Sequence, residues 1–356
     1  MEKITVFTPS LNIGGIERVL NTYAKGLAEK GYPVTYLTVY SKGELDIVAS
    51  DNLEYQHLGT KRLRDSLFAL VRYFRNNRPD IVFVANDATL IVYVAKLLSG
   101  VSFKIISSQH NYYDIYAKVG VKQTFVAKYI FPLCFKVVAV SEGIRSMLIK
   151  NFHLKADRVV KIYNPIDLSL INKYALDPVC DLPQEYLLFV GRFEKVKNIP
   201  LLLDAFSKFH QAYSNVKLLL IGGGPEEQFI TSYIQELGLE NAVKNLGIKS
   251  NPFPYINNAK VIVLSSISEA FPTVLLESLS LGKTIVSTPT LGAIDILKHG
   301  KYGYISASLD NPNDLFCKLA NAYNTPLNQD VLKKYAESNY DLRTRVAEFE
   351  RLWKVF

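Results

Sequence analysis

The sequence predicts an α/β protein made of two doubly wound parallel-sheet domains. Short, continuously apolar segments alternate with segments of helical periodicity, and this alternation is interrupted once near the middle of the 356 residues. Strands that are apolar along their whole length are typical of parallel sheets with helices on both faces. We therefore expect two Rossmann-like domains that face each other across a cleft.

The expected strands form two series, one on each side of a linker. The segment 162–183 is rich in Asp, Asn and Pro and has little periodicity, which predicts the linker. The expected boundaries are residues 1–168 and 169–340, with a C-terminal helix, 341–356, that packs back on the first domain. The strands are expected at Ile4–Pro9, Val34–Val39, Ile81–Val84, Lys104–Ser107 and Val137–Val140, then at Tyr186–Val190, Val216–Ile221, Val243–Leu246, Lys260–Leu264 and Thr284–Ser287.

Composition excludes several classes of protein. With 49% hydrophobic and 21% charged residues, the chain can bury a core and is not disordered by composition. Apolar runs such as Val261–Leu264 are far shorter than the about 20 residues of a membrane span, and Met1–Pro9 lacks the features of an export signal. The three cysteines have no metal-ligand spacing. A reduced, cytoplasmic protein is expected.

The net positive charge of +8 lies entirely in the first half of the chain. Residues 1–168 hold 22 Lys and Arg against 14 Asp and Glu, whereas residues 169–356 hold 19 of each. Such asymmetry suggests an anionic surface or ligand for the first domain, or simply a solvated basic face. Residues 61–78 form a basic amphipathic pattern, for which packing on the sheet is favoured over lying on a membrane.

Three segments have the residue types of a phosphate and sugar site, each after an expected strand. Gly14 and Gly15 precede a helix and would allow a ligand close to the backbone. Gly191 and Arg192, with Lys197 five residues after the Arg, could hold a diphosphate from two sides, while Gly222–Pro225 makes room for it.

The most specific segment is Ser268–Glu277. Glu269 is expected in a loop at the strand edge, and Glu277 about one turn into the following helix, with Pro272 in the first turn. Carboxylates accept hydrogen bonds from paired sugar hydroxyls, and the N–H groups of Phe271–Leu275 would face phosphate oxygens.

Together these motifs resemble those of glycosyltransferase family four. Glu269 and Glu277 resemble the E-x7-E signature of its retaining, nucleotide-sugar-dependent enzymes, and the resemblance extends to Gly14–Glu17, Gly191–Lys197 and Asn164–Asp167. It covers nearly the whole chain with the motifs in the expected order. It implies the GT-B fold, no cofactor, no metal, and a nucleotide sugar, more often UDP-linked than GDP-linked, as substrate.

The resemblance also implies a role for each matching residue. His110 and Glu269 would be catalytic, His110 lying near the donor sugar. Ala270 stands where the family usually has Gly. If this position must adopt positive φ, Ala strains the backbone more than Gly does, and its methyl group could narrow the sugar pocket and change the sugar preference. The implied donor-binding residues are Gly14, Gly15, Arg192, Lys197, Ile248, Glu269, Ala270, Phe271, Pro272, Thr273, Val274, Leu275 and Glu277.

For the acceptor, the resemblance implies a lipid-linked polyprenyl-diphosphate glycan or a lipopolysaccharide of bacterial surface-glycan synthesis, such as O-antigen. The basic N-terminal half, including the apolar, lysine-bearing segment 123–136, would contact an anionic membrane at its inner face. A soluble acceptor remains open. An inverting transferase or an epimerase is also an alternative, although those enzymes lack the E-x7-E pattern. An oxidoreductase would need G-x-G-x-x-G after a strand, which is missing, and a solute receptor would need an export signal. Nucleic-acid binding has no supporting motif.

Overall fold

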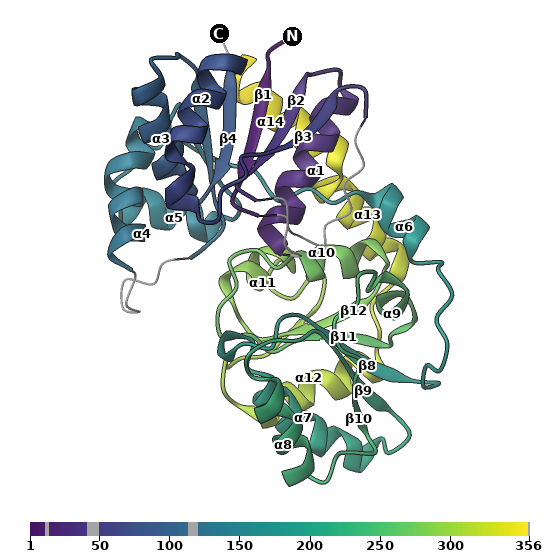
Figure 1. Cartoon of the computed structure of the whole chain (residues 1–356). Coiled ribbons are helices and arrows are strands. Elements are labelled where there is room, and N and C mark those ends of the chain that lie inside the picture. Colours follow the sequence, from purple (N-terminus) through teal and green to yellow (C-terminus); the bar gives the residue numbers. More distant parts are fainter. Residues whose placement is uncertain (11–13, 41–49, 113–119, 355–356) are drawn as a thin grey trace. The chain divides into compact units, whose positions relative to one another are not determined.

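The computed structural model describes residues 1–10, 14–40, 50–112 and 120–354. The chain divides into two compact units, Met1–Ile166 with Leu342–Phe356 and Asp167–Asp341 (Figure 1). Each unit is a parallel sheet with helices packed on it, and each is described by itself. No helix among the described residues is long and apolar enough to cross a membrane.

The first unit contains a seven-stranded parallel sheet in the order β3-β2-β1-β4-β5-β6-β7. Strand order reverses beside β1, so the loops after β1 and β4 leave the same edge in opposite directions, where open α/β sheets bind ligands. The strands are β1 Ile4–Thr8, β2 Val34–Thr38, β3 Leu53–His57, β4 Ile81–Ala85, β5 Lys104–Gln109, β6 Lys136–Ala139 and β7 Val159–Lys161.

Helices cover this sheet, and one of them is the C-terminal helix of the chain. They are α1 Gly15–Glu29, α2 Leu67–Asn77, α3 Ala88–Ser99, α4 Val121–Phe125, α5 Glu142–Lys150 and α14 Leu342–Lys354, with short 3-10 or π turns at Leu63–Ser66, Val126–Ile130 and Phe131–Leu133. In the basic segment 61–78, Leu70, Val71 and Phe74 are buried, and the Tyr73 hydroxyl lies 3.0 Å from Thr5 Oγ1 of β1. The segment therefore packs on the sheet, as favoured.

The close approach of α14 to α1 depends on a glycine. A Cβ built at Gly26 would lie 2.7 Å from Val346 and 2.8 Å from Leu342, so a side chain there would force these two side chains or the helix itself to shift. On the same face the ring of Phe349 lies 4.8 Å from that of Tyr23. The single Trp353 is buried and packs edge-on against a tyrosine ring of the same unit.

The second unit contains a six-stranded parallel sheet in the order β10-β9-β8-β11-β12-β13. Its strands are β8 Tyr186–Val190, β9 Lys217–Ile221, β10 Val243–Asn245, β11 Val261–Leu264, β12 Thr284–Ser287 and β13 Tyr304–Ile305. Its helices are α6 Leu168–Tyr174, α7 Ile199–Ala212, α8 Glu227–Glu236, α9 Phe253–Asn258, α10 Thr273–Ser280, α11 Leu291–Ile296, α12 Pro312–Asn324 and α13 Gln329–Tyr340, with a 3-10 turn at Lys195–Lys197.

The differences from the sequence prediction lie at the sheet edges and in the linker. The strands β3, β7 and β13 were not predicted, because β3 alternates polar residues at a partly exposed edge and the other two have three and two residues. The expected linker contains a helix, α6, which begins where the Asp167 carboxylate accepts a hydrogen bond from Leu170 N at 3.0 Å.

Candidate functional site

Three loops at the carboxyl edge of the second sheet are joined by backbone hydrogen bonds. Gly191 N donates to Ile221 O at 2.9 Å, Phe193 N to Gly223 O at 2.9 Å, and Gly222 N to Gly247 O at 3.0 Å. A Cβ at Gly222, whose φ is +151°, would lie 1.9 Å from the carbonyl oxygen of Gly191. Only glycine at position 222 therefore allows the loop that carries Arg192 to approach so closely.

The structure brings Lys197 and Glu269 together although 72 residues separate them. Lys197 Nζ lies 2.5 Å from Glu269 Oε1, and their side chains are 21% and 13% exposed. The Ser266 hydroxyl donates to the same carboxylate oxygen at 2.7 Å. Because both side chains are partly exposed, a phosphate could bind the ammonium and a sugar hydroxyl could reach the carboxylate.

Arg192 does not join this ion pair. Its guanidinium lies 2.8 Å from Glu194 Oε1, and its side chain is 70% exposed. A long exposed arginine has many accessible rotamers, so this side chain is available to an anion that approaches the Gly191 loop.

The helix α10 begins one residue later than expected. It starts at Thr273, and Pro272 is its N-cap residue rather than a first-turn residue. The expectation that all amides of Phe271–Leu275 face a phosphate is corrected, because Pro272 has no N–H and Leu275 N donates to Pro272 O at 3.2 Å. The first-turn N–H groups of Thr273 and Val274 remain as donors at this helix end.

The side chains around this helix start have different environments. Phe271 is buried and packs edge-on against Tyr340, with ring centroids 6.0 Å apart. Glu277 is buried in the middle of α10. Ala270 is not among the described residues with positive φ, so the Ala that replaces the usual Gly causes no backbone strain. Ile248 is 66% exposed, and its side chain lies over Gly223.

In the first unit, His110 lies at the carboxyl end of β5 and is buried. Its Nε2 is 2.9 Å from Ser108 Oγ, and its backbone N donates to the Asn86 side chain at 2.9 Å. Burial lowers the pKa of His110 to about 4, so the ring is neutral at pH 7. A neutral imidazole can exchange a hydrogen bond with a sugar hydroxyl, but it does not supply a positive charge.

The pKa of His110 makes a prediction for folding stability. The ring should stay neutral down to about pH 4 in the native protein, whereas in the unfolded chain it protonates near pH 6.5. The contribution of the neutral ring to the free energy of unfolding is fully present above pH 6.5 and is lost as the pH falls toward 4. The total loss is on the order of 3 kcal/mol. Histidine NMR titration should find this ring neutral at pH 5. Titration near 6.5 in the native state would contradict the prediction.

Gly14 and Gly15 lie at the start of α1, and Asn12 and Ile13 of the same motif fall outside the described residues. Gly14 is the N-cap residue, with φ −126°, and a Cβ there would clash with the Glu17 carboxylate, whereas a Cβ at Gly15 would meet no atom within 4 Å. The backbone at Gly15 is therefore open at a helix N-terminus, which suits an anion, while the Glu17 side chain lies against Gly14.

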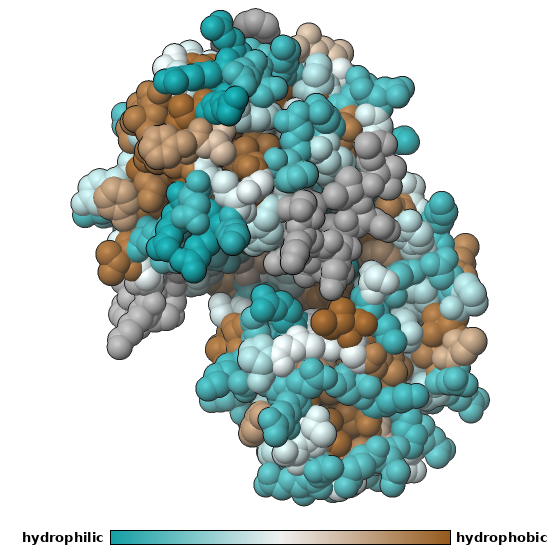
Figure 2. Space-filling view, in the orientation of Figure 1, coloured by the Kyte–Doolittle hydropathy of each residue, from teal (hydrophilic) through white to brown (hydrophobic). Residues whose placement is uncertain are grey.

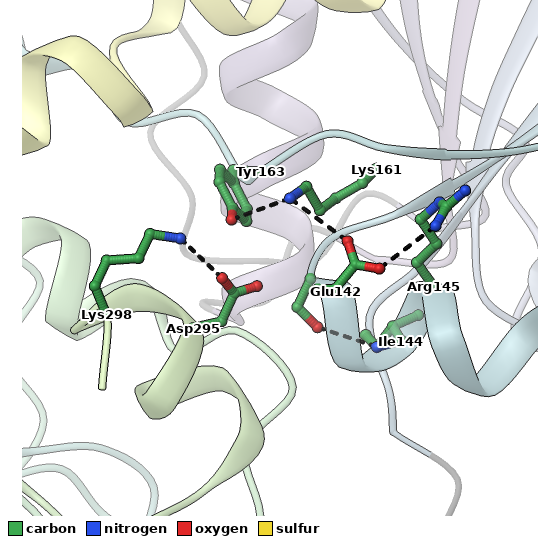
Figure 3. Close-up of polar contacts among 8 residues, drawn as sticks. Glu142, Ile144, Arg145, Lys161, Tyr163, Asp295 and Lys298 are labelled. Atoms are coloured by element: carbon green, nitrogen blue, oxygen red, sulfur yellow. Dashed lines mark hydrogen bonds and ion pairs between the residues drawn. The ribbon is translucent and has the colours of Figure 1, made fainter. Parts of the chain in front are cut away.

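The end of β7 leads into the Asn164–Asp167 motif through a polar cluster (Figure 3). Lys161 Nζ lies 3.5 Å from Glu142 Oε2 and donates to the Tyr163 hydroxyl at 3.4 Å, while Arg145 contacts the other oxygen of Glu142 at 3.4 Å. The adjacent Asn164 is buried, and its side-chain oxygen has no hydrogen-bond partner among the described residues. Figure 3 also shows an ion pair of the second unit, between Asp295 in α11 and Lys298, which follows this helix.

Sequence reasoning missed the residues that support Glu269. Ser265 and Ser266 follow β11 and are buried, Thr288 Oγ1 donates to Ser266 O at 2.6 Å, and Gly292 N donates to Glu269 O at 2.9 Å. Two serines directly after an apolar strand were the available signal, since buried hydroxyls need partners.

Within the described part of the chain, no group of three or more His, Cys, Asp or Glu side chains is arranged as metal ligands. The candidate anion-binding groups at the carboxyl edge of the second sheet are the side chains of Arg192 and Lys197 and the start of α10. This set of donors is suited to a diphosphate.

Two family models match the chain. The one described as "Glycosyltransferase Family 4" matches residues 13–170, and the one described as "Glycosyl transferases group 1" matches residues 178–339. Together they span both units and both sets of loops described above.

Individual proteins match over similar lengths. The N-acetylgalactosamine-N,N'-diacetylbacillosaminyl-diphospho-undecaprenol 4-alpha-N-acetylgalactosaminyltransferase of Campylobacter jejuni is 26% identical, over 99% of this chain and 97% of its own. The lipopolysaccharide 1,6-galactosyltransferase of Escherichia coli is 28% identical, over 75% of this chain and 71% of its own.

A solved structure matches the whole fold. HepE from Anabaena, determined in complex with UDP and glucose, has a TM-score of 0.81 at 18% identity and covers 100% of both chains. This likeness concerns the fold, two Rossmann-like parallel-sheet domains. The chain belongs to glycosyltransferase family 4 and has the GT-B fold.

Proposed function

We propose that this glycosyltransferase moves a hexose or N-acetylhexosamine from a UDP-sugar to an undecaprenyl-diphosphate-linked glycan, with retention of anomeric configuration. The observation that carries the proposal is the partly exposed Lys197–Glu269 pair before the N-terminus of α10, which combines a cation suited to phosphate with a carboxylate suited to sugar hydroxyls. Similarity over nearly the full length to the C. jejuni transferase supports the acceptor class.

In the proposed donor complex, Lys197 and Arg192 bind the diphosphate together with the N–H groups of Thr273 and Val274. Glu269 accepts hydrogen bonds from the sugar hydroxyls, and Glu277 from the ribose hydroxyls. Gly247 and the exposed Ile248 face the base. We also assign Gly14, Gly15 and His110 of the first unit to donor binding, on the resemblance of their motifs to those of the family.

The proposed reaction breaks the bond between the sugar C1 and the diphosphate oxygen. UDP leaves with the electron pair, and the acceptor oxygen forms a new bond to C1 on the same face of the sugar. The acceptor hydroxyl proton passes to the departing phosphate oxygen. The transition state resembles an oxocarbenium ion, and the cations stabilise the charge that gathers on UDP.

A second acceptor is a lipopolysaccharide, and the E. coli relative favours it. The test of both is release of UDP or GDP from a panel of nucleotide sugars, with and without purified undecaprenyl-diphosphate glycans or lipopolysaccharide core. We expect release from one UDP-sugar to rise several-fold with the undecaprenyl lipid. Release with a soluble acceptor alone would overturn the lipid-linked assignment, and release from none would overturn the donor assignment.

We further propose that transfer requires no metal, because Arg192, Lys197 and the α10 N-terminus neutralise the leaving group. Treatment with EDTA followed by desalting should leave the initial rate within about twofold of the untreated rate, and added Mg²⁺ or Mn²⁺ should not raise it further. A loss of most activity that Mg²⁺ restores would contradict this.

We propose that the first unit contacts an anionic membrane at the cytoplasmic face. The support is a cluster of exposed apolar side chains on α4 and the two turns after it: Val121, Phe125, Tyr129 and Leu133 are 88%, 45%, 53% and 55% exposed. Figure 2 shows apolar residues gathered on the side of this unit where α3 and α4 lie. The ammonium of Lys128, which lies 5.5 Å from the centre of the Tyr129 ring, complements anionic headgroups.

The membrane proposal makes a prediction for vesicle binding. Replacing Phe125 and Tyr129 with Ser should lower the fraction of protein that sediments with vesicles of phosphatidylglycerol and phosphatidylethanolamine several-fold, since exposed aromatic area is lost. The matched control is Phe229→Ser, which removes a 51% exposed aromatic side chain from α8 of the second unit. Equal sedimentation of both variants would contradict the assignment.

A further inference from the structure

Two adjacent serines at the end of β11 have hydroxyl groups with different partners. Ser265 and Ser266 are both 0% exposed. Ser265 Oγ donates to the backbone oxygen of Lys197 at 2.8 Å, whereas Ser266 Oγ donates to Glu269 Oε1 at 2.7 Å. One serine therefore contacts the loop of the phosphate-binding cation, and the other contacts the sugar-binding carboxylate.

The contacts of Glu269 explain why a second donor is needed. Lys197 Nζ and Ser266 Oγ both approach Oε1, and among the described residues Oε2 has no hydrogen-bond or ion-pair partner, so it can accept from a sugar hydroxyl. A bound diphosphate competes for the Lys197 ammonium because it carries more negative charge than one carboxylate. When Lys197 turns to the diphosphate, the Ser266 hydroxyl still holds Oε1.

The surroundings fix the position of Ser266. Thr288 Oγ1 donates to Ser266 O at 2.6 Å, and Thr288 N donates to Leu264 O at 2.9 Å. On the other side of the loop, Gly292 N donates to Glu269 O at 2.9 Å. A Cβ at Gly292 would lie 2.7 Å from Ala270 O, so glycine allows this close support. Thr288, just after β12, and Gly292, in the first turn of α11, thus fix the backbones of Ser266 and Glu269 relative to each other.

We propose that Ser265 and Ser266 are positioning residues with separate roles in donor binding. Ser266 orients Glu269 toward the donor sugar, and Ser265 holds the backbone of Lys197 where its ammonium reaches the diphosphate. The inference rests on the proposed function, since it assigns these supports to the sugar and diphosphate parts of the same donor site.

The experiment measures calorimetric dissociation constants for UDP and for the UDP-sugar that the wild type uses, without acceptor. In Ser266→Ala we expect the UDP-sugar constant to rise about tenfold, from loss of a hydrogen bond to a charged group, and the UDP constant to stay within about twofold. In Ser265→Ala both constants should rise by the same factor, because the diphosphate is common to both ligands.

Further measurements separate this role from a structural one. Ser266→Cys keeps nearly the same volume but donates weakly, so it should reproduce the selective loss with Tm near that of the wild type. Equal weakening of UDP and UDP-sugar in Ser266→Ala and Ser266→Cys, or no weakening, would overturn the inference while the proposed function stands. A wild type that binds neither ligand would overturn the proposed function, and this inference with it.

Discussion

Replacing Glu269 with Gln is expected to lower kcat/KM for sugar transfer by about 10²–10³-fold. The amide has only one accepting oxygen and no charge, so it can neither pair with Lys197 nor accept strong hydrogen bonds from two sugar hydroxyls. Binding of UDP alone should not weaken and should become somewhat tighter, because the neutral amide no longer competes with the diphosphate for the Lys197 ammonium. Initial rates with the preferred donor and acceptor, beside UDP affinity, measure both effects.

The matched control is Glu240→Gln, which makes the same chemical change at an exposed position after α8. It should keep the wild-type rate. If Glu269→Gln kept more than about a third of wild-type kcat/KM, or if both variants lost activity alike, the assignment of Glu269 to the donor site would be wrong.

Replacing Gly222 with Ala is expected to destabilise the second unit by about 3 kcal/mol or more. The new Cβ would stand 1.9 Å from the backbone oxygen of Gly191, and the same residue donates its N–H to Gly247 O, so the loop cannot move without breaking that bond. Differential scanning calorimetry should show the melting transition of the second unit at a much lower temperature, with UDP binding lost.

Gly238→Ala is the control for this variant. Gly238 also has positive φ, +65°, but a Cβ there meets no atom within 4 Å, so only backbone strain of about 1 kcal/mol is expected. Equal melting temperatures for the two variants would show that the close approach of the Gly191 and Gly222 loops does not exist in solution.

The sheets could be predicted from the sequence because buried parallel strands are continuously apolar, as in Val261–Leu264. The edge strand Leu53–His57 could not, because its Glu, Gln and His face solvent and remove the apolar signal. The helix α6 was missed because its seven residues are few for a periodic pattern, and its signal is the capping residue Asp167.

The candidate site could be predicted in part. Lys197 and Glu269 each follow an apolar strand, and the topology of a parallel sheet brings such loops to one edge. The sequence does not specify that Arg192 pairs with Glu194, since an exposed side chain has many rotamers. It also does not single out Ser266, because a buried serine has meaning only through its partner, here Glu269.

The most direct test of the account is the anomeric configuration of the transferred sugar in the lipid product, determined by NMR. The wild-type protein, its preferred α-linked UDP-sugar and an undecaprenyl-diphosphate glycan should give an α-linked product with release of UDP. A β-linked product would contradict retention, and UDP release without a glycosylated lipid would contradict transfer to that acceptor.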